Sequence, residues 1–454
     1  MKVIINNICI GFFLLGKMDV NLVLNSKAKA FLAASNIGSD VWWQSLTLWG
    51  CPIIMDHESG TAKVTFFWQD PSGNESQSSV AQVLLQINSV TDHHSWEPVS
   101  LARVAGTNVW HKQICVESTW RGSYSFIPLT YEQMPHLAFS KSDGSSQAQR
   151  RWYISIMDQA LPDLLNPFPI SIDGKTSALH LPNAESELGW PQWDSGELTV
   201  PSDRVMTFSW DSTVLENSRS IYAFQTGEDS DSKPLVILLD GQKWATSSGT
   251  PAVLEYLTQQ QRIAPAQYLL IDSIDGKVRW SELSCHSDFW QAVFDELFPL
   301  AQQHGVQLDR VSTTLVAGQS LGGLAALYAG LHWPKKVQKV ISLSGSFWWP
   351  DVNRELPCDP TLLAYTPPNS LSAQLQLGQL KASHLDIFMS VGSGEGDMNR
   401  YNENMLAALE ADRLVTFANQ PARLIYDRFC GGHDWLAWRS SLVKGLVALL
   451  APSA

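Results

Sequence analysis

The chain has 454 residues, enough for two or three domains that each bury a core of their own. Its formal net charge of −13 argues against a nucleic-acid-binding surface, and an anionic ligand would need local arginines to hold it. The six cysteines are scattered singly, which argues against a disulfide framework and against a zinc site.

Residues 1–40 are predicted to form an N-terminal extension. Lys2 and the apolar stretch Val3–Gly16 have the character of a signal peptide, but two asparagines interrupt the stretch and no convincing cleavage site follows it. The stretch is too short to span a bilayer. We favour translation starting at Met18, and the alternative is that residues 1–17 act as a leader.

Residues 41–160 show the period-two pattern that is typical of strands. Strands are predicted at Lys63–Gln69, Val80–Val90, Val109–Val116 and Tyr124–Ile127. The first of them ends at a turn, Asp70-Pro71-Ser72-Gly73. Short strands separated by turns at these intervals predict an all-β sandwich domain.

The cluster Asp92-His93-His94 in this domain has the residue types of a metal site. Adjacent histidines on an extended segment point to opposite sides, however, and rarely share one ion. We therefore expect no metal site here.

Residues 161–204 are rich in proline and have no apolar period, so they are predicted to be an irregular linker. From 205 to 454, strands and helices alternate. Continuous apolar strands with helices between them indicate a mostly parallel sheet covered on both faces. The predicted strands are Arg219–Gln225, Pro234–Leu239, Ala266–Asp272, Thr313–Ala317, Lys339–Leu343, Asp386–Val391 and Arg423–Tyr426, with helices at Asp288–His304, Leu324–Leu331 and Arg439–Leu450.

A nucleophilic serine is predicted at Ser320. The string Gly318-Gln319-Ser320-Leu321-Gly322 lies between an apolar strand and an Ala/Leu-rich helix, as a nucleophile elbow requires. Small neighbours let strand and helix pass close together while the serine takes strained backbone angles. Carboxylates and then a histidine follow downstream, which is the chain order of α/β-hydrolases. The fold class is therefore α/β, with a C-terminal α/β-hydrolase domain after the N-terminal sandwich.

His433 is the candidate base, because paired glycines precede it in a loop between the last strand and the last helix. The preferred acid is Glu395, with Asp397 as the alternative, both in the glycine-flanked loop after the strand Asp386–Val391, and with Asp434 a remote third.

The developing oxyanion needs two backbone donors. The amide of Leu321 would supply one, and the loop containing Gly241 and Gln242 would supply the other.

The motifs found so far occur in an order that resembles the enterochelin (enterobactin) esterases, which hydrolyse ferric siderophores. The resemblance covers nearly the whole chain beyond about Lys63. The segments that carry it are Phe67–Pro71, Val90–His94, Ala105–Trp110, Trp120–Tyr124, Leu238–Gly241, Ile271–Asp275, Glu282–Cys285, Val316–Pro334, Gly345–Pro350 and Gly431–Asp434.

The resemblance implies cytoplasmic hydrolysis of the esters of a catecholate trilactone carrying iron(III). It places the nucleophile on Ser320, the base on His433 and the acid on Glu395. Here the loop 392–397 is richer in glycine than expected for the family, and Asp397 is an added competitor for the acid. The resemblance implies no cofactor, because iron enters with the substrate. The expected partner is a small ferric siderophore, with no nucleic acid and no membrane; a periplasmic location is the alternative, and the oligomeric state stays open.

A ferric tris-catecholate is a bulky trianion with aromatic faces, so its site is expected to offer guanidinium groups and flat apolar walls. The candidate contacts within the resembling motifs or beside them are Arg279, Arg121, Lys243, Trp244, Trp348, Trp349 and Trp435. Two other functions are compatible with the sequence. One is a general carboxylesterase or acyltransferase of the same fold, and the other is a siderophore- or glycan-binding module.

Overall fold

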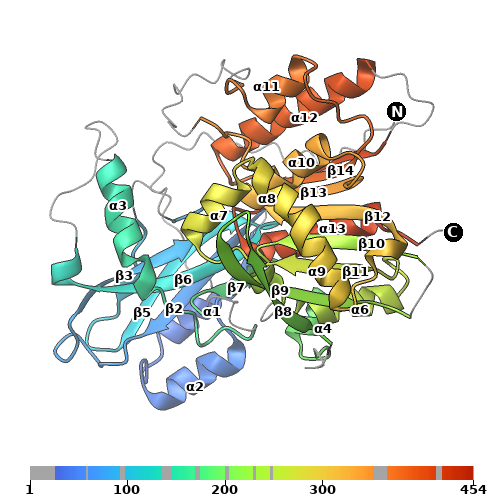
Figure 1. The fold of residues 1–454 in the computed structure, drawn as a ribbon. Helices are drawn as coiled ribbons and strands as arrows, with labels where there is room; N and C mark the ends of the chain where they lie inside the picture. Colours follow the sequence, from blue (N-terminus) through green and yellow to red (C-terminus); the bar gives the residue numbers. More distant parts are fainter. Residues whose placement is uncertain are drawn as a thin grey trace. The chain divides into compact units, whose positions relative to one another are not determined.

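The computed structural model describes residues 26–57, 60–92, 98–134, 146–168, 174–199, 204–228, 232–245, 249–351, 366–415 and 422–452. These residues divide into two compact units (Figure 1). The β unit contains the described residues up to Ser186 together with Cys430–Ala437. The α/β unit contains Glu187–Phe429 and the chain from Trp438 onward.

The β unit contains two antiparallel sheets. One has the strand order β1-β2-β5-β4, formed by Ile53–His57, Thr61–Gln69, Val109–Glu117 and Ala102–Arg103. The other has the order β3-β6-β7, formed by Val80–Ile87, Arg121–Thr130 and Ser177–His180. Phe66 of β2 and Tyr124 of β6 meet edge to face with centroids 4.9 Å apart, so the two sheets share one core. The predicted sandwich is confirmed.

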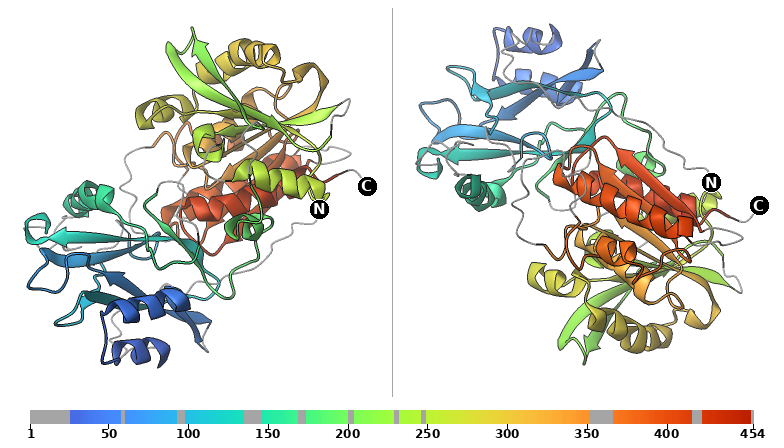
Figure 2. Two further views of the ribbon diagram at one scale, coloured as in Figure 1. Left: turned by 90° about the horizontal axis from the view of Figure 1, so that it is seen from below. Right: turned by 90° about the horizontal axis from the view of Figure 1, so that it is seen from above.

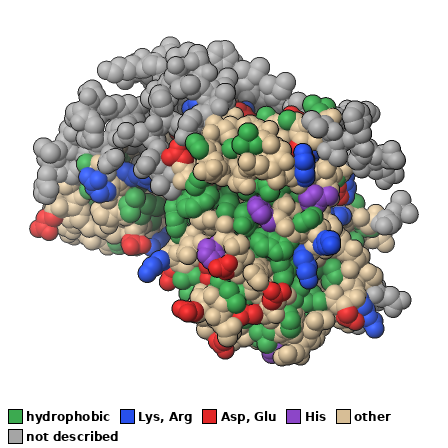
Figure 3. All heavy atoms as spheres, turned by 45° about the horizontal axis from the view of Figure 1, so that its top comes forward, with side chains coloured by type: hydrophobic (Ala, Val, Ile, Leu, Met, Phe, Trp, Pro, Cys, Tyr) green, Lys and Arg blue, Asp and Glu red, His purple; other side chains and the backbone are tan. Residues whose placement is uncertain are grey.

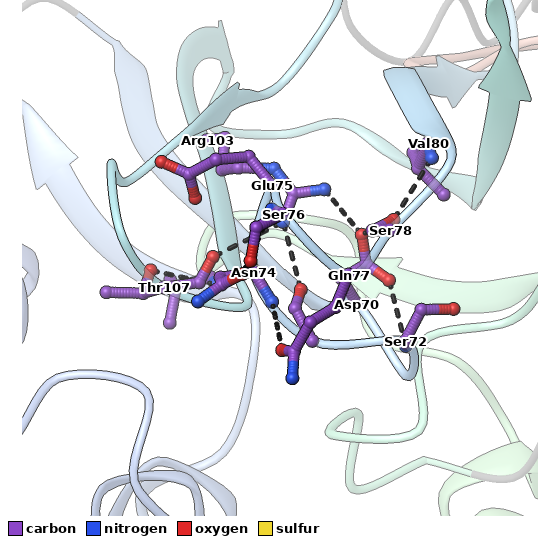
Figure 4. Close-up of polar contacts among 12 residues, drawn as sticks. Asp70, Ser72, Asn74, Glu75, Ser76, Gln77, Ser78, Val80, Arg103 and Thr107 are labelled. Carbon is purple, nitrogen blue, oxygen red and sulfur yellow. Dashed lines mark hydrogen bonds and ion pairs between the residues drawn. The ribbon is translucent and has the colours of Figure 1, made fainter.

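The predicted turn after β2 is built around a buried carboxylate (Figure 4). Asp70 accepts hydrogen bonds from Ser72 N at 3.0 Å and Ser78 Oγ at 2.6 Å, and it forms an ion pair with Arg103 at 2.5 Å. The Arg103 guanidinium also lies over the Trp110 ring. The turn therefore joins β2 to β4 and to the segment that precedes β3.

Three helices complete the β unit: α1 (Ser26–Leu32), α2 (Asp40–Trp49) and α3 (Ser146–Ile156). Ala28 of α1 is fully buried in a cluster with Trp42 of α2 and Phe67 of β2. Part of the predicted extension 1–40 is thus integral to this unit. The segment His93–His94 and residues 1–25 lie outside the described residues.

The predicted linker 161–204 was wrong in part, because it contains ordered elements of both units. β7 pairs antiparallel with the start of β6, and α4 (Trp190–Asp194) buries Trp190 completely. The division between the units falls at Ser186/Glu187. A four-residue strand is too short to show a period in the sequence, which is why the prediction missed it.

A buried carboxylate in the β unit makes its stability depend on pH. Asp163 accepts a hydrogen bond from Tyr124 Oη at 2.7 Å and from Leu165 N at 2.9 Å. Burial raises the pKa of Asp163 from 3.8 to about 6, against these two hydrogen bonds, which lower it. The folded state holds this proton more tightly than the unfolded state does. The free energy of unfolding therefore falls as pH rises from about 4 through about 6.

We expect Asp163→Asn to abolish this pH dependence. The free energy of unfolding of the variant minus that of the wild type should rise by on the order of 2–3 kcal/mol from pH 4 to pH 7. Urea unfolding of both proteins at pH 4.5 and 7.5 measures the difference. Asp158→Asn, which removes a carboxylate 98% exposed in the same unit, is the matched control and should lack the trend. An equal difference at both pH values for Asp163→Asn would refute the account.

The α/β unit is built on an eight-stranded sheet of order β15-β14-β13-β12-β10-β11-β9-β8. Six strands are parallel, and β9 and β8 extend one edge antiparallel, which confirms the predicted mostly parallel sheet. In sequence order the strands are β8 (Met206–Ser212), β9 (Asn217–Gln225), β10 (Lys233–Leu239), β11 (Gln267–Ile271), β12 (Val311–Gln319), β13 (Lys339–Leu343), β14 (Asp386–Gly392) and β15 (Leu424–Phe429).

Helices cover both faces of this sheet (Figures 1 and 2). Gly330 of α10 approaches Val340, whereas Gly445 of α13 approaches the neighbouring Ile341. Successive residues of a strand point to opposite faces, so α10 and α13 lie on opposite sides. The helices after α4 are α5 (Gly241–Ala245), α6 (Thr250–Gln259), α7 (Gly276–Leu283), α8 (Ser287–Ala292), α9 (Phe298–Gln303), α10 (Leu321–His332), α11 (Leu371–Gln376), α12 (Asp397–Val415) and α13 (Trp435–Leu449).

The predicted helix Asp288–His304 is interrupted by a π-helical turn at Val293–Leu297. Pro299, two residues after the turn, lacks an N–H group, so the regular hydrogen-bond ladder cannot continue through it. Among the described residues, no helix has the length and apolar character needed to cross a membrane.

Candidate active site

Ser320 stands between the end of β12 and the start of α10, where the sequence predicts a nucleophile elbow. Its backbone has φ 57° and ψ −120°, angles that cost a non-glycine residue on the order of 1–3 kcal/mol. The strain is held by Ser320 N, which donates to Leu343 O at 2.8 Å, and by Ser320 O, which accepts from Ser346 N at 3.0 Å. The neighbouring strand β13 thus fixes the turn.

Two glycines permit the close crossing of β12 and α10. A Cβ at Gly318 would lie 2.4 Å from Gly322 O, and a Cβ at Gly323 would lie 2.8 Å from Ser342 Oγ and 3.1 Å from Gly345 Cα. At Gly322 a Cβ would meet only ordinary contacts, the nearest at 3.5 Å. On the helix side, glycine is therefore required at Gly323, whereas the predicted motif ended with Gly322.

A second hydroxyl lies close to the half-buried Ser320 hydroxyl. Ser346 Oγ lies 3.4 Å from Ser320 Oγ, on the loop after β13. Three of the described cysteines are poor nucleophiles near neutral pH. Burial raises the pKa of the Cys51 and Cys115 thiols and raises the pKa of Cys285 to about 12, so these thiols stay protonated near neutral pH.

Arg279, a predicted substrate contact, is engaged by a buried carboxylate. Its Nε and Nη2 donate to the two oxygens of Asp240 at 2.6 and 2.9 Å, and Nη2 also donates to Gln319 O at 3.2 Å. Gln319 Nε2 donates to the same carboxylate. The network ties the end of β10 to α7 and to the residue before Ser320, so a large part of the Arg279 charge is compensated locally.

The predicted oxyanion-hole residues lie at the carboxyl ends of β10 and β12. Leu321 is the buried first residue of α10, and Gly241 is the first residue of α5. A Cβ at Gly241 would lie 2.5 Å from Ile271 N, so β11 runs directly beside this loop. The Gln242 side chain exchanges hydrogen bonds with Ser273, which leaves the backbone amides of the loop as the relevant donors.

The two candidate acids differ in their surroundings. Glu395 is buried after β14, and its Oε1 accepts hydrogen bonds from Ser344 Oγ and Gly392 N, each at 2.6 Å. Ser344 Oγ in turn accepts from Trp438 Nε1 at 2.9 Å. Asp397 is exposed at the start of α12, 3.6 Å from Arg400. The buried and oriented carboxylate is Glu395.

His433 lies in the segment Cys430–Ala437, which belongs to the β unit. The residue is half-buried, and its carbonyl oxygen accepts a hydrogen bond from Asn88 Nδ2 at 3.1 Å. Asp434 accepts two hydrogen bonds from Ser123 and one from Leu436 N. Asp434 is thus occupied in holding the backbone.

Three tryptophans of the α/β unit lie together on α7 and on the loop after β13. Trp348 is buried and Trp349 half-buried, and Trp280 lies within 5.7 Å of the first ring and 5.8 Å of the second. Trp280 is 44% exposed, and the sequence analysis missed it because a single tryptophan on a helix carries no pattern. Trp244 is only 2% exposed and donates to Gln319 Oε1, so it is a core residue.

The other predicted substrate contacts, Arg121, Trp435 and Lys243, lie on separate elements. Arg121 begins β6 in the β unit, where Nε donates to His180 Nδ1 at 3.1 Å and Nη2 donates to Glu185 O. Trp435 is half-buried in the same unit, and Lys243 is exposed on α5. On the face drawn in Figure 3, acidic and basic side chains are interspersed among exposed hydrophobic ones.

Two family models match the chain. Residues 63–190 match the model described as enterochelin esterase, N-terminal, and residues 212–449 match the model described as putative esterase. The first matched region lies largely within the β unit, and the second covers most of the α/β unit together with the segment Cys430–Ala437.

Curated and solved proteins show the same similarity over nearly the full length. The iron(III) enterobactin esterase of Dickeya dadantii is 39% identical, covering 92% of this chain and 94% of that protein. The iron(III) enterobactin esterase of Escherichia coli K12 is 36% identical, with coverages of 93% and 98%. The crystal structure of the ferric enterobactin esterase of Salmonella typhimurium superposes with a TM-score of 0.76 at 36% identity, covering 90% of this chain and 98% of that one.

Proposed function

The chain belongs to the iron(III) enterobactin esterase family, and from this premise we propose that Ser320, His433 and Glu395 carry out its hydrolysis. The protein is an ester hydrolase of a ferric catecholate siderophore. A structure of the Shigella flexneri enterobactin esterase, 36% identical, was determined in the presence of enterobactin. The observation that supports Ser320 most strongly is its strained backbone at the junction of β12 and α10.

The proposed reaction proceeds through an acyl-enzyme. His433 takes the proton of Ser320 Oγ as the oxygen attacks a lactone carbonyl, and the C=O electron pair moves onto oxygen. The amide of Leu321 and the amides at Gly241 and Gln242 stabilise this oxyanion. Collapse breaks the ester C–O bond, and the leaving alkoxide receives the proton from His433.

Water completes the cycle. His433 removes a proton from a water molecule, whose oxygen attacks the acyl-enzyme carbonyl, and the Ser320 oxygen leaves with that proton. Glu395 holds the imidazole in the required tautomer and stabilises the imidazolium. We assign this role to Glu395 over Asp397 because Ser344 and Gly392 fix its carboxylate. The proposed chemistry uses no cofactor of the protein's own, since iron(III) enters with the substrate.

For substrate binding we propose the exposed Trp280 and the half-buried Trp349 rather than the buried tryptophans. Trp349 and Trp280 offer flat apolar faces to catechol rings, and the buried Trp348 packs against both of them. Trp244 is a core residue and is not proposed as a contact. Arg121, Lys243 and Trp435 remain candidate contacts, and Arg279 acts mainly through Asp240. We further propose that the reaction takes place in the cytoplasm, where the freed iron can be reduced.

Purified protein incubated with ferric enterobactin and, separately, with a plain aryl ester tests the proposed activity. We expect chromatography to show 2,3-dihydroxybenzoyl-serine products from the siderophore. Rapid cleavage of the aryl ester with the siderophore intact would instead identify a general carboxylesterase. Binding of the siderophore without cleavage of either compound would identify a binding module.

A further inference from the structure

We propose that the β unit positions the histidine of the active site, with Ser123 and Asn88 fixing the backbone on both sides of His433. The inference rests on the proposed function, because it takes His433 as the base. Within the β unit, contacts from two strand ends converge on the five residues Cys430–Asp434.

The segment containing His433 continues the sheet β3-β6-β7. β3 ends opposite Tyr124 of β6. On the part of β6 that precedes Tyr124, Arg121 pairs in parallel with Gly431, and Arg121 N donates to Cys430 O at 3.1 Å. N–H groups two residues apart on a strand point to the same side. Ser123 N therefore also points to this segment, and it donates to Asp434 Oδ2 at 2.6 Å.

Asp434 connects β6 to the start of α13 immediately after His433. Its Oδ2 accepts from both Ser123 N and Ser123 Oγ at 2.6 Å, and its Oδ1 accepts from Leu436 N at 2.8 Å. The carboxylate is 5% exposed, so these charge-assisted hydrogen bonds operate away from bulk water. The residue that follows His433 is thereby held from two directions.

The turn after β3 supports the residues before and at His433. Asn88 Nδ2 donates to the His433 carbonyl at 3.1 Å. A Cβ at Gly432 would lie 2.3 Å from Ser89 Oγ and 2.7 Å from Ser89 Cβ, so only glycine fits against this turn. Ser89 has φ 60°, and its N–H donates to Asp92 Oδ2, which keeps the turn in shape.

Because these contacts hold the backbone of His433, only its two side-chain torsions remain to set the position of the ring. A base must be held within a fraction of an ångström of its productive position, and displacement by about 1 Å costs on the order of 10²-fold in rate. Ser123, Asp434 and Asn88 are accordingly positioning residues, which act through the backbone of His433 and touch no reacting atom.

The test is Ser123→Ala, which removes the hydroxyl donor to Asp434. We expect kcat for ferric enterobactin to fall by roughly 10- to 100-fold while KM changes less than about twofold. Ser123→Thr restores a hydroxyl and should recover most of kcat. Ser125→Ala is the matched control, because Ser125 is also a serine of β6. Its side chain is fully buried, and its hydroxyl has no hydrogen-bond partner among the described residues. This control should retain wild-type kcat.

Thermal unfolding of each variant separates positioning from loss of fold. If Ser123→Ala is not folded at the assay temperature, Asn88→Asp takes its place, because it removes the donor to the His433 carbonyl and keeps the side-chain shape; the same fall in kcat is expected. Wild-type kcat in the folded variant, or an equal loss in Ser125→Ala, overturns the proposal. Retention of activity by Ser320→Ala would instead overturn the proposed function on which the inference rests.

Discussion

Ser320→Ala is expected to lower kcat for ferric enterobactin by about 10⁴- to 10⁶-fold, because it removes the hydroxyl proposed to form the acyl-enzyme. Affinity should change little, since the substitution removes one oxygen and keeps the backbone turn that Leu343 and Ser346 hold. Product formation followed by chromatography gives kcat. Quenching of tryptophan fluorescence by the bound ferric siderophore gives the affinity.

Ser346→Ala is the matched control for this variant. It deletes a hydroxyl 3.4 Å from Ser320 Oγ without touching the proposed nucleophile. We expect a loss of less than about tenfold, because hydrogen bonds between neutral groups contribute on the order of 1 kcal/mol. An equal loss in the two variants, or substantial activity in Ser320→Ala, would contradict the assignment of the nucleophile.

Glu395→Gln is expected to lower kcat by about 10³- to 10⁴-fold, as for an amide in the acid position of other serine triads. Gly392 N and Ser344 Oγ both donate to Oε1, so the amide oxygen of a glutamine should keep this position and its NH₂ group should replace Oε2. An NH₂ group cannot accept a hydrogen bond from an imidazole N–H, and the histidine would adopt the wrong tautomer.

Asp397→Asn serves as the comparison, because it neutralises the exposed carboxylate of the same loop. Its kcat should stay within about threefold of the wild type. Should Asp397→Asn lose most of the activity while Glu395→Gln keeps it, the acid assignment would have to be exchanged.

The α/β unit was largely predictable because its signals are local. Each buried parallel strand is a continuous apolar run, and glycines within three residues of Ser320 indicate the turn there. The position of Glu395 after β14 follows from the strand that precedes it. The sequence favoured Glu395 and left Asp397 as an alternative, because the burial that separates the two carboxylates depends on what packs around the loop.

The features that the sequence analysis missed depend on contacts between distant parts of the chain. Arg279 was expected to meet the substrate, but its partner Asp240 lies 39 residues away and no local pattern links them. The hydrogen bond from Ser123 to Asp434 spans 311 residues, so nothing near His433 indicates that its segment belongs to the β unit. Likewise, β7 became recognisable only through its pairing with β6.

The most direct test of the account is to look for the covalent intermediate itself. The protein is mixed with ferric enterobactin, quenched with acid within the first turnovers, digested, and analysed by mass spectrometry. The account predicts an acyl adduct on the peptide that contains Ser320, formed by the wild type and absent from Ser320→Ala. An adduct on another residue, or the same adduct in Ser320→Ala, would contradict it.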